Sequence, residues 1–420
     1  FYRSVGGTGN YTWTEWSSGV DDKCLPTKPN SHAFVDLNGD CLPDLVLTTS
    51  CGIEVWLNSG GTKAFWELRA SDTTAFRQIG LDAWNPDEAD GQIVFADFNG
   101  DGTIDLAFHN EDEGHIRILL NLQFPRKYGL LCIPDNKWSL EERTAITGIH
   151  LTPQKLGKAM EIPRSMRVGD FNFDGWPDLL ALTSSGKIEL FENLGNFKDD
   201  TSVASFAKFE NDKALREVDD AVAATFVDID ESGRQDILVV QSHGTRLIWN
   251  NYNRHADSLF FKGTGLSSLS YFSNDPRPFA PVPGNTFKLS FDSPDGPMQH
   301  ACSQCPQTAY LPLQACSCLF GLTRISNYIE EMAMGGATLS RSWSNLMPNS
   351  MAVIWPDLSE GTKSWWMEYF TQRRGGQIQG IVSFLIGCLV GVALAIWYLS
   401  WRERKEDLME QYQRADTFHL

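Results

Sequence analysis

Four segments of this chain carry the same pattern of oxygen-bearing side chains. Counted from the first aspartate of each segment as position 1, an acid, amide or hydroxyl side chain stands at positions 1, 3, 5 and 9. Oxygen ligands at this spacing, completed by the backbone carbonyl of position 7, can wrap a hard cation such as Ca²⁺. The predicted ligands, loop by loop, are Asp36, Asn38, Asp40, Leu42 and Asp44; Asp97, Asn99, Asp101, Thr103 and Asp105; Asp170, Asn172, Asp174, Trp176 and Asp178; and Asp228, Asp230, Ser232, Arg234 and Asp236.

Two other structures are compatible with an acidic loop of this length. An EF-hand needs a glutamate at position 12 and a helix on either side. Position 12 is apolar in all four segments and the flanking residues alternate as strands do, so the EF-hand is rejected. A turn rich in Asp and Asn that binds no metal is the plainer alternative. One copy would leave the two interpretations even, whereas four copies in register favour calcium.

The first and fourth loops depart from the common pattern. Position 6, where a sharp turn favours a positive φ, is glycine in the second, third and fourth loops, at Gly102, Gly175 and Gly233. Cys41 occupies that position in the first loop, and we expect it to form a disulfide with Cys24 or Cys51. Ser232 replaces the carboxylate of position 5 in the fourth loop. These two loops are therefore expected to bind the ion more weakly.

The chain as a whole is acidic. Its 420 residues include 35 Lys and Arg against 53 Asp and Glu, which gives a formal net charge of −18. This balance argues against nucleic acid as a partner, because phosphate binding needs clustered basic side chains. Each loop also brings three carboxylates together, and these would repel one another in an empty site. The sequence therefore predicts that stability falls when calcium is low.

The elements that would position the loops are short strands. Each loop lies between two apolar runs, such as HAFV (32–35) before the first loop and LVLTT (45–49) after it. The loops recur at intervals of roughly 60 residues, which is the size of a propeller blade. They resemble the FG-GAP blades of integrin α subunits, in which the calcium loop joins two strands. The resemblance implies an all-β, integrin-α-like β-propeller over residues 1–262, with N-terminal blades expected to be absent from this chain.

A second β domain is expected over residues 263–372. Strand-like runs at 286–291 and 351–356 flank closely spaced cysteines, and this region resembles the small β-sandwich that follows FG-GAP repeats in several extracellular proteins. Zinc is the alternative use of these cysteines, but the second pair is CxC, which favours disulfides in an extracellular context. The spacing leaves the pairing open. The disulfide candidates are Cys24, Cys41, Cys51, Cys132, Cys302, Cys305, Cys316 and Cys318.

One segment near the C-terminus is suited to cross a membrane. Residues 381–401 contain no charge and no proline, and the span is predicted as a transmembrane helix over 378–401. Eight of the nine cysteines and the glycosylation sequon at Asn10 precede it. The N-terminal region is therefore expected outside the cell or in the lumen, and residues 402–420 in the cytosol. This orientation predicts a type I membrane glycoprotein of the plasma membrane or the secretory pathway.

Taken end to end, the chain resembles the T-cell immunomodulatory proteins, which carry integrin-α FG-GAP repeats. The resemblance rests on SHAFVD (31–36), DAVAATFVD (220–228), PNS followed by MAVIWP (348–356), and the single span with a short charged tail that ends DTFHL. It implies a cell-surface or secretory-pathway glycoprotein with an adhesion-like ectodomain.

The leading hypothesis for function is a non-enzymatic binding module that engages an extracellular or lumenal protein or glycan. A role as subunit of a larger membrane complex is a further possibility. The alternatives are a propeller lectin, in which an exposed tryptophan such as Trp13, Trp16, Trp84 or Trp138 stacks on sugars, and an extracellular hydrolase or lyase. The motifs HExxH and GxSxG are absent from the sequence. His109 and His115 lie near three acidic residues, but a solvated loop explains them better than an acid–base site.

Overall fold

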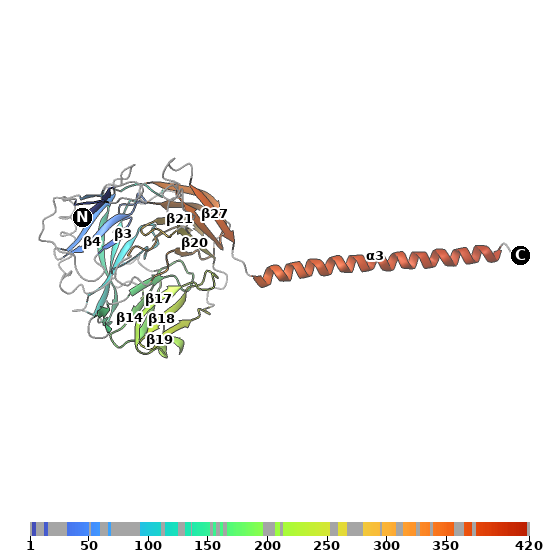
Figure 1. Cartoon of the computed structure of the whole chain (residues 1–420), viewed down its shortest axis with the longest axis horizontal. Coiled ribbons are helices and arrows are strands. Elements are labelled where there is room, and N and C mark those ends of the chain that lie inside the picture. Colours follow the sequence, from blue (N-terminus) through green and yellow to red (C-terminus); the bar gives the residue numbers. More distant parts are fainter. Residues whose placement is uncertain are drawn as a thin grey trace. The chain divides into compact units, whose positions relative to one another are not determined.

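Four small β-sheets, one built around each repeated loop, are followed in the computed structural model by a β-sandwich and a long helix (Figure 1). The chain divides into two units, residues 1–371 and residues 372–420. The structure describes residues 2–5, 12–15, 32–49, 52–58, 66–68, 93–110, 114–124, 131–135, 137–151, 154–156, 160–162, 166–195, 206–210, 213–252, 259–266, 280–294, 296–307, 314–324, 328–336, 339–356, 365–371 and 375–417.

The first two of these sheets, blade 1 and blade 2, are antiparallel meanders in which each strand pairs with the next along the chain. Blade 1 consists of β3 (His32–Val35), β4 (Asp44–Thr49), β5 (Gly52–Asn58) and β6 (Trp66–Leu68). Blade 2 consists of β7 (Val94–Ala96), β8 (Asp105–Asn110), β9 (His115–Leu122) and β10 (Ser139–Thr147). In both blades the repeated loop joins the first two strands, as the FG-GAP resemblance implies.

Blade 3 and blade 4 repeat this plan. Blade 3 consists of β13 (Met166–Gly169), β14 (Asp178–Leu182), β15 (Ile188–Asn193) and β16 (Phe206–Lys208). Blade 4 has three described strands, β17 (Ala221–Val227), β18 (Asp236–Gln241) and β19 (Gly244–Ile248). The remaining elements of this region are two hairpins and a one-turn helix: β1 (Tyr2–Val5) with β2 (Thr12–Glu15), β11 (Gln154–Leu156) with β12 (Met160–Ile162), and α2 (Lys213–Arg216).

Apolar cores lie between successive blades. Leu106 and other residues of blade 2 pack against Val35 of blade 1, and Phe98 packs in a second core with Met166 of blade 3. A third core joins blades 3 and 4. Every residue of β14 is buried, because blade 3 is covered on both faces, so its apolar residues do not alternate with polar ones. Face-to-face stacking of sheets in chain order is the arrangement of propeller blades, and the predicted all-β FG-GAP fold is confirmed.

The C-terminal β domain is a sandwich of two four-stranded sheets, with strand orders β23-β20-β26-β27 and β22-β21-β24-β25. Its core includes Phe261, Phe287 and Ile354. β20 straddles the boundary expected between residues 262 and 263, and it pairs in parallel with β26 inside the sandwich. The strands are β20 (Phe260–Gly265), β21 (Thr286–Ser293), β22 (Gly296–Ser303), β23 (Cys318–Gly321), β24 (Ile329–Gly335), β25 (Ser340–Leu346), β26 (Ser350–Trp355) and β27 (Trp366–Thr371).

The second unit is a single helix, α3 (Gly375–Thr417). Its part from Val382 onward is long and apolar enough to cross a membrane. The large apolar side chains in this part are exposed rather than packed in a protein core. This helix and the FG-GAP fold fit a single-pass membrane protein.

Candidate cation-binding loops

Loops 1 to 4, named after their blades, share one backbone conformation. The residue before position 1 pairs with position 9, as Val35 pairs with Asp44 and Ala96 with Asp105, so each loop closes a hairpin. Positions 4 and 6 both have positive φ in every loop. These residues are Gly39 and Cys41, Gly100 and Gly102, Phe173 and Gly175, and Glu231 and Gly233. The left-handed conformation is therefore imposed by the loop, even where the residue is not glycine.

The aspartate at position 1 organises each loop from inside. In loop 2, Asp97 Oδ1 accepts the N–H of Asp101 at 3.1 Å and Oδ2 accepts the N–H of Gly102 at 2.9 Å. The N–H of position 6 donates to Oδ2 of position 1 in the other loops as well, at 2.8 Å in loop 1, 2.9 Å in loop 3 and 3.2 Å in loop 4. At least one oxygen of this carboxylate is thus bonded to the loop backbone, and in loops 1 and 2 both are.

Positions 3, 5 and 7 are linked by a second set of hydrogen bonds. In loop 3 the amide of Asn172 donates to Asp174 Oδ2 at 2.8 Å, and the N–H of Trp176 donates to Asp174 Oδ1 at 2.9 Å. In loop 4 the hydroxyl of Ser232 takes the place of the carboxylate and accepts the N–H of Arg234 at 3.3 Å. The predicted oxygen ligands of positions 3 and 5 are therefore brought together in the loop, with the hydroxyl as the weaker acceptor.

The aspartate at position 9 also holds the loop to the sheet. Asp105 Oδ2 accepts the N–H of Phe98, and its Oδ1 accepts the N–H of Asn121, both at 2.8 Å. Blades 1 and 3 repeat this pair of bonds. A carboxylate oxygen that accepts one hydrogen bond keeps a lone pair for a cation. Position 9 can thus be a ligand and a structural anchor at once.

A recurrent asparagine, which the sequence analysis missed, connects blades 2, 3 and 4 each to the preceding blade. Asn121 Nδ2 donates to the carbonyl of Leu37 in blade 1 at 3.0 Å. Asn193 donates in the same way to Phe98 of blade 2, at 3.0 Å, and Asn250 donates to Phe171 of blade 3, at 2.7 Å. The acceptor is always position 2 of the loop. The sequence contains a signal for this residue, because the asparagine follows position 9 by 14 to 16 residues in every blade.

The sandwich packs directly against the four loops. Lys288 of β21 pairs with Asp36 of loop 1 at 2.9 Å, and Lys262 of β20 pairs with Asp228 of loop 4 at 3.0 Å. In loop 2 the N–H of Ala301, on β22, donates to Asp97 Oδ2 at 3.0 Å. In loop 3, a Cβ atom added to Gly321 of β23 would lie 1.9 Å from Asp170 Oδ2. The first carboxylate of every loop therefore faces the sandwich.

Burial makes the loop carboxylates costly to ionise. Desolvation raises the pKa of Asp40 to about 6, and the neighbouring carboxylate of Asp36 contributes in the same direction. Burial is also the main cause, and nearby carboxylates the second, of pKa values well above the usual range at Asp44, Asp97, Asp105, Asp170 and Asp178. A bound cation would favour the charged forms of these groups.

The loop residues fit a mixed set of ligands. Among the described residues, no three His, Cys, Asp or Glu side chains come close enough to hold a metal by themselves. A cation would therefore also need the amide, hydroxyl and carbonyl oxygens, as the predicted ligand set has it. Within the loops, three buried carboxylate oxygens have no hydrogen-bond partner among the described residues, namely Oδ1 of Asp170, Oδ1 of Asp228 and Oδ2 of Asp236. An unpaired buried oxygen of this kind is what a cation would satisfy.

Three disulfides are present among the described cysteines. Cys302 bonds to Cys318, and Cys305 bonds to Cys316, so the CxxC and CxC pairs form disulfides rather than a zinc site. The expected partners of Cys41 were wrong, because it bonds to Cys132 across 91 residues. Spacing favoured a local partner, whereas the fold brings the segment before β10 against loop 1. Cys24, Cys51 and the sequon residue Asn10 lie outside the described residues.

The residues considered for enzymatic or sugar-binding roles have structural partners. His109 was expected in a solvated loop, but it is buried in β8 and its Nε2 lies 2.9 Å from the carbonyl of Ile149. His115 begins β9 on the neighbouring strand. Trp138 packs against the core between blades 1 and 2. These placements give no support to an acid–base pair or to a sugar-stacking role of Trp138.

His300 of β22 gives the sandwich a dependence on pH. It is fully buried, it packs against Phe291, and burial lowers the pKa of its imidazole to about 4. The folded protein therefore keeps this group neutral, whereas the unfolded chain takes up a proton as pH falls below about 6.5. Between pH 7.5 and 5, this residue alone should lower the free energy of unfolding by about 2 kcal/mol.

Urea denaturation of His300→Leu and the parent at both pH values, with calcium held constant, measures this difference. The variant should lose about 2 kcal/mol less on acidification than the parent. His243→Leu, at an exposed histidine, is the matched control and should behave as the parent. Equal pH dependence of His300→Leu and the parent would contradict the assignment.

Two different family models match the propeller and the sandwich. The FG-GAP-like repeat model matches residues 36–108 and 170–239, which include loops 1 to 4, and the model described as ITFG1, C2 domain, matches residues 280–370 of the sandwich. The T-cell immunomodulatory protein of Macaca fascicularis is 30% identical over 286 residues, which cover 62% of this chain and 90% of that protein. The chain belongs to the T-cell immunomodulatory protein family. The predicted family is confirmed.

The T-cell immunomodulatory protein family extends well beyond primates. The mouse protein is 27% identical over 437 residues, which cover 96% of this chain and 68% of that protein. A homologue from Plasmodium falciparum is 28% identical, and the match covers 92% of this chain and 61% of the homologue. This chain thus spans about two thirds of the length of such relatives. In this chain the FG-GAP loops and the C2 domain of the family lie in contact.

Proposed function

We propose that this protein is a non-enzymatic binding module on a single-pass membrane anchor, and that calcium stabilises its propeller. The proposed partner is a protein or glycan on the extracellular or lumenal side, and the protein can also serve as a subunit of a larger membrane complex. The three disulfides support that side for the propeller and sandwich, because such bonds persist in oxidising compartments. The type I orientation follows from this argument.

The observation that carries the calcium proposal is the unpaired Oδ1 of Asp170. This atom is buried in loop 3 and lacks a hydrogen-bond partner in the described chain, while Oδ2 of the same group bonds to Gly175. Asn172 and Asp174 supply further oxygens in the same loop. An isolated buried carboxylate oxygen is unfavourable unless a proton or a cation satisfies it. Loop 4 repeats the observation, because Asp228 Oδ1 and Asp236 Oδ2 are also buried and have no hydrogen-bond partner among the described residues.

The proposed role of calcium is structural. The ligand set of protein oxygens would fill the coordination shell of Ca²⁺, which leaves no open position for a substrate. The ion would offset the repulsion among the carboxylates of one loop. It would thereby hold the first two strands of a blade in register and keep the loop that binds it in the shape against which the sandwich packs.

A thermal melt of the full chain in detergent, with calcium and then with EGTA, tests the proposal. Calcium should raise Tm by at least roughly 5 °C, because each site filled at 100 times its Kd adds about 3 kcal/mol to the free energy of unfolding. The double variant Asp97→Ala, Asp101→Ala removes two ligands of loop 2. The rise in Tm that calcium produces should be clearly smaller for this variant than for the parent.

The increment, rather than Tm itself, is the quantity to compare, because Asp97→Ala also removes hydrogen bonds from the calcium-free loop. Asp219→Asn changes an exposed carboxylate outside the loops and should keep the full increment. A parent protein whose Tm is the same in calcium and in EGTA would show that the loops are plain turns.

A further inference from the structure

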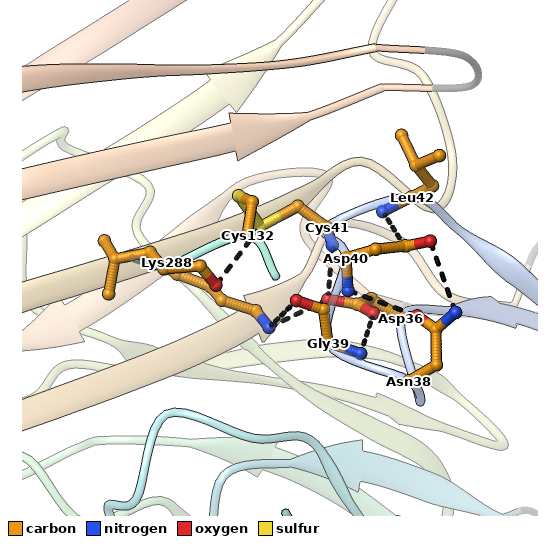
Figure 2. The surroundings of a disulfide bond; sticks show 9 residues. Asp36, Asn38, Gly39, Asp40, Cys41, Leu42, Cys132 and Lys288 are labelled. Carbon is orange, nitrogen blue, oxygen red and sulfur yellow. Dashed lines mark hydrogen bonds and ion pairs between the residues drawn. A yellow bond between two sulfur atoms is a disulfide. The ribbon is translucent and has the colours of Figure 1, made fainter. Parts of the chain in front are cut away.

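Loop 1 already contains a cation that belongs to the protein. The ammonium of Lys288 lies 2.9 Å from Asp36 Oδ2 and 3.4 Å from the carbonyl oxygen of Gly39 (Figure 2). The side chains of Lys288 and Asp36 are 2% and 0% exposed, so water does not screen the pair. β21 is an inner strand between β22 and β24, so this lysine stands in the middle of a sheet rather than at its edge.

Both oxygens of Asp36 have partners, and Oδ2 has two. Oδ1 accepts the N–H of Gly39 at 2.7 Å, while Oδ2 accepts the N–H of Cys41 at 2.8 Å as well as the bond from Lys288. Every loop-1 carboxylate thus has a donor, because Asp40 accepts from Leu42 and Asp44 accepts from two backbone N–H groups. The carboxylates of loop 2 accept backbone and side-chain hydrogen bonds as well, so the feature that sets loop 1 apart is the buried ammonium of Lys288 on Asp36.

No other loop has so deeply buried a lysine on its position-1 carboxylate among the described residues. No described lysine or arginine pairs with Asp97, Asp101 or Asp105 of loop 2, or with Asp170 of loop 3. Loop 4 has Lys262 on Asp228, but this lysine is 16% exposed, and Asp228 Oδ1 and Asp236 Oδ2 remain buried without a hydrogen-bond partner among the described residues.

Loop 1 is also closed by a covalent bond. Cys41 stands at position 6, where the other loops have glycine, and it forms a disulfide with Cys132. Gly335 of β24 packs against the backbone carbonyl of the same Cys41. Figure 2 shows the disulfide and the Lys288 ion pair on the same side of the loop, beside Asp36. The loop shape that calcium is proposed to maintain in the other blades is maintained here by a disulfide and an ion pair.

We propose that loop 1 binds no calcium, that Lys288 supplies the positive charge in its place, and that the chain has three calcium sites, in loops 2, 3 and 4. This inference rests on the proposed calcium function. A divalent ion on Asp36 would lie beside a buried ammonium with no water between them, and like charges repel strongly in such surroundings. The contact of the sandwich with blade 1 is therefore independent of calcium.

Counting the calcium bound at saturation, by equilibrium dialysis of the full chain in detergent, tests the inference. The parent should bind three ions. Lys288→Met keeps most of the side-chain volume and removes the charge, so this variant should bind four. Lys262→Met is the matched control at loop 4 and should still bind three.

A second pair of variants covers the case in which Lys288→Met does not fold. Asp40→Ala and Asp101→Ala remove the position-5 carboxylate from loops 1 and 2, at side chains that are not fully buried. Asp40→Ala should leave the count at three, and Asp101→Ala should lower it to two. A parent that binds four ions, or an Asp40→Ala variant that loses one, overturns the inference and leaves the calcium function standing. A parent that binds none overturns both.

Discussion

Replacing Cys41 and Cys132 together by serine is expected to lower the free energy of unfolding by about 4 kcal/mol. The disulfide spans 91 residues, so its loss releases a long segment of the unfolded chain, and the cost grows with the length of the closed loop. Because the bond joins loop 1 to the segment before β10, its loss also loosens the contact between blades 1 and 2. Urea denaturation of the full chain in calcium measures the change.

A second double variant separates the covalent bond from the backbone conformation. Cys41 has a φ of 69°, which glycine adopts without strain. Cys41→Gly with Cys132→Ser should therefore be more stable than the double serine variant by about 0.5 to 1 kcal/mol, while still lacking the disulfide. If the double serine variant unfolds at the parent's urea concentration, the disulfide does not hold this region.

Gly335→Ala is expected to cost about 3 kcal/mol or to prevent folding of the sandwich against blade 1. A Cβ atom at this position would lie 1.7 Å from the carbonyl oxygen of Cys41 and 2.5 Å from its carbonyl carbon. These are backbone atoms, and the disulfide to Cys132 restricts their movement. The methyl group can be accommodated only if loop 1 and β24 move apart, which would also stretch the Lys288 ion pair.

The neighbouring glycine provides the control for this prediction. A Cβ atom on Gly336 would have no neighbour closer than 3.7 Å, so Gly336→Ala should change the free energy of unfolding by no more than about 0.5 kcal/mol. Thermal and urea denaturation of the two alanine variants would be compared with the parent. Equal stability of Gly335→Ala and Gly336→Ala would show that loop 1 and β24 are not in contact in solution.

Much of the fold could be predicted from the sequence because the repeat is local. The spacing of Asp97, Asn99, Asp101 and Asp105 specifies one loop within nine residues, and the apolar runs on either side specify the two strands that it joins. The recurrent asparagine, Asn121 in blade 2, also lies at a short and regular distance after position 9. Its role could not be inferred from the sequence, because its acceptor is the carbonyl of Leu37 in another blade.

The sequence by itself determined the four loops, the blades around them, the disulfide-bearing sandwich and the apolar helix, because each depends on residues close together in the chain. Only the tertiary structure decided that the sandwich packs on the loops, that Cys41 bonds to Cys132, and that Lys288 reaches Gly39 across 249 residues. Such contacts depend on how separately folded segments pack, and neither spacing nor periodicity records the partner of a residue so distant along the chain.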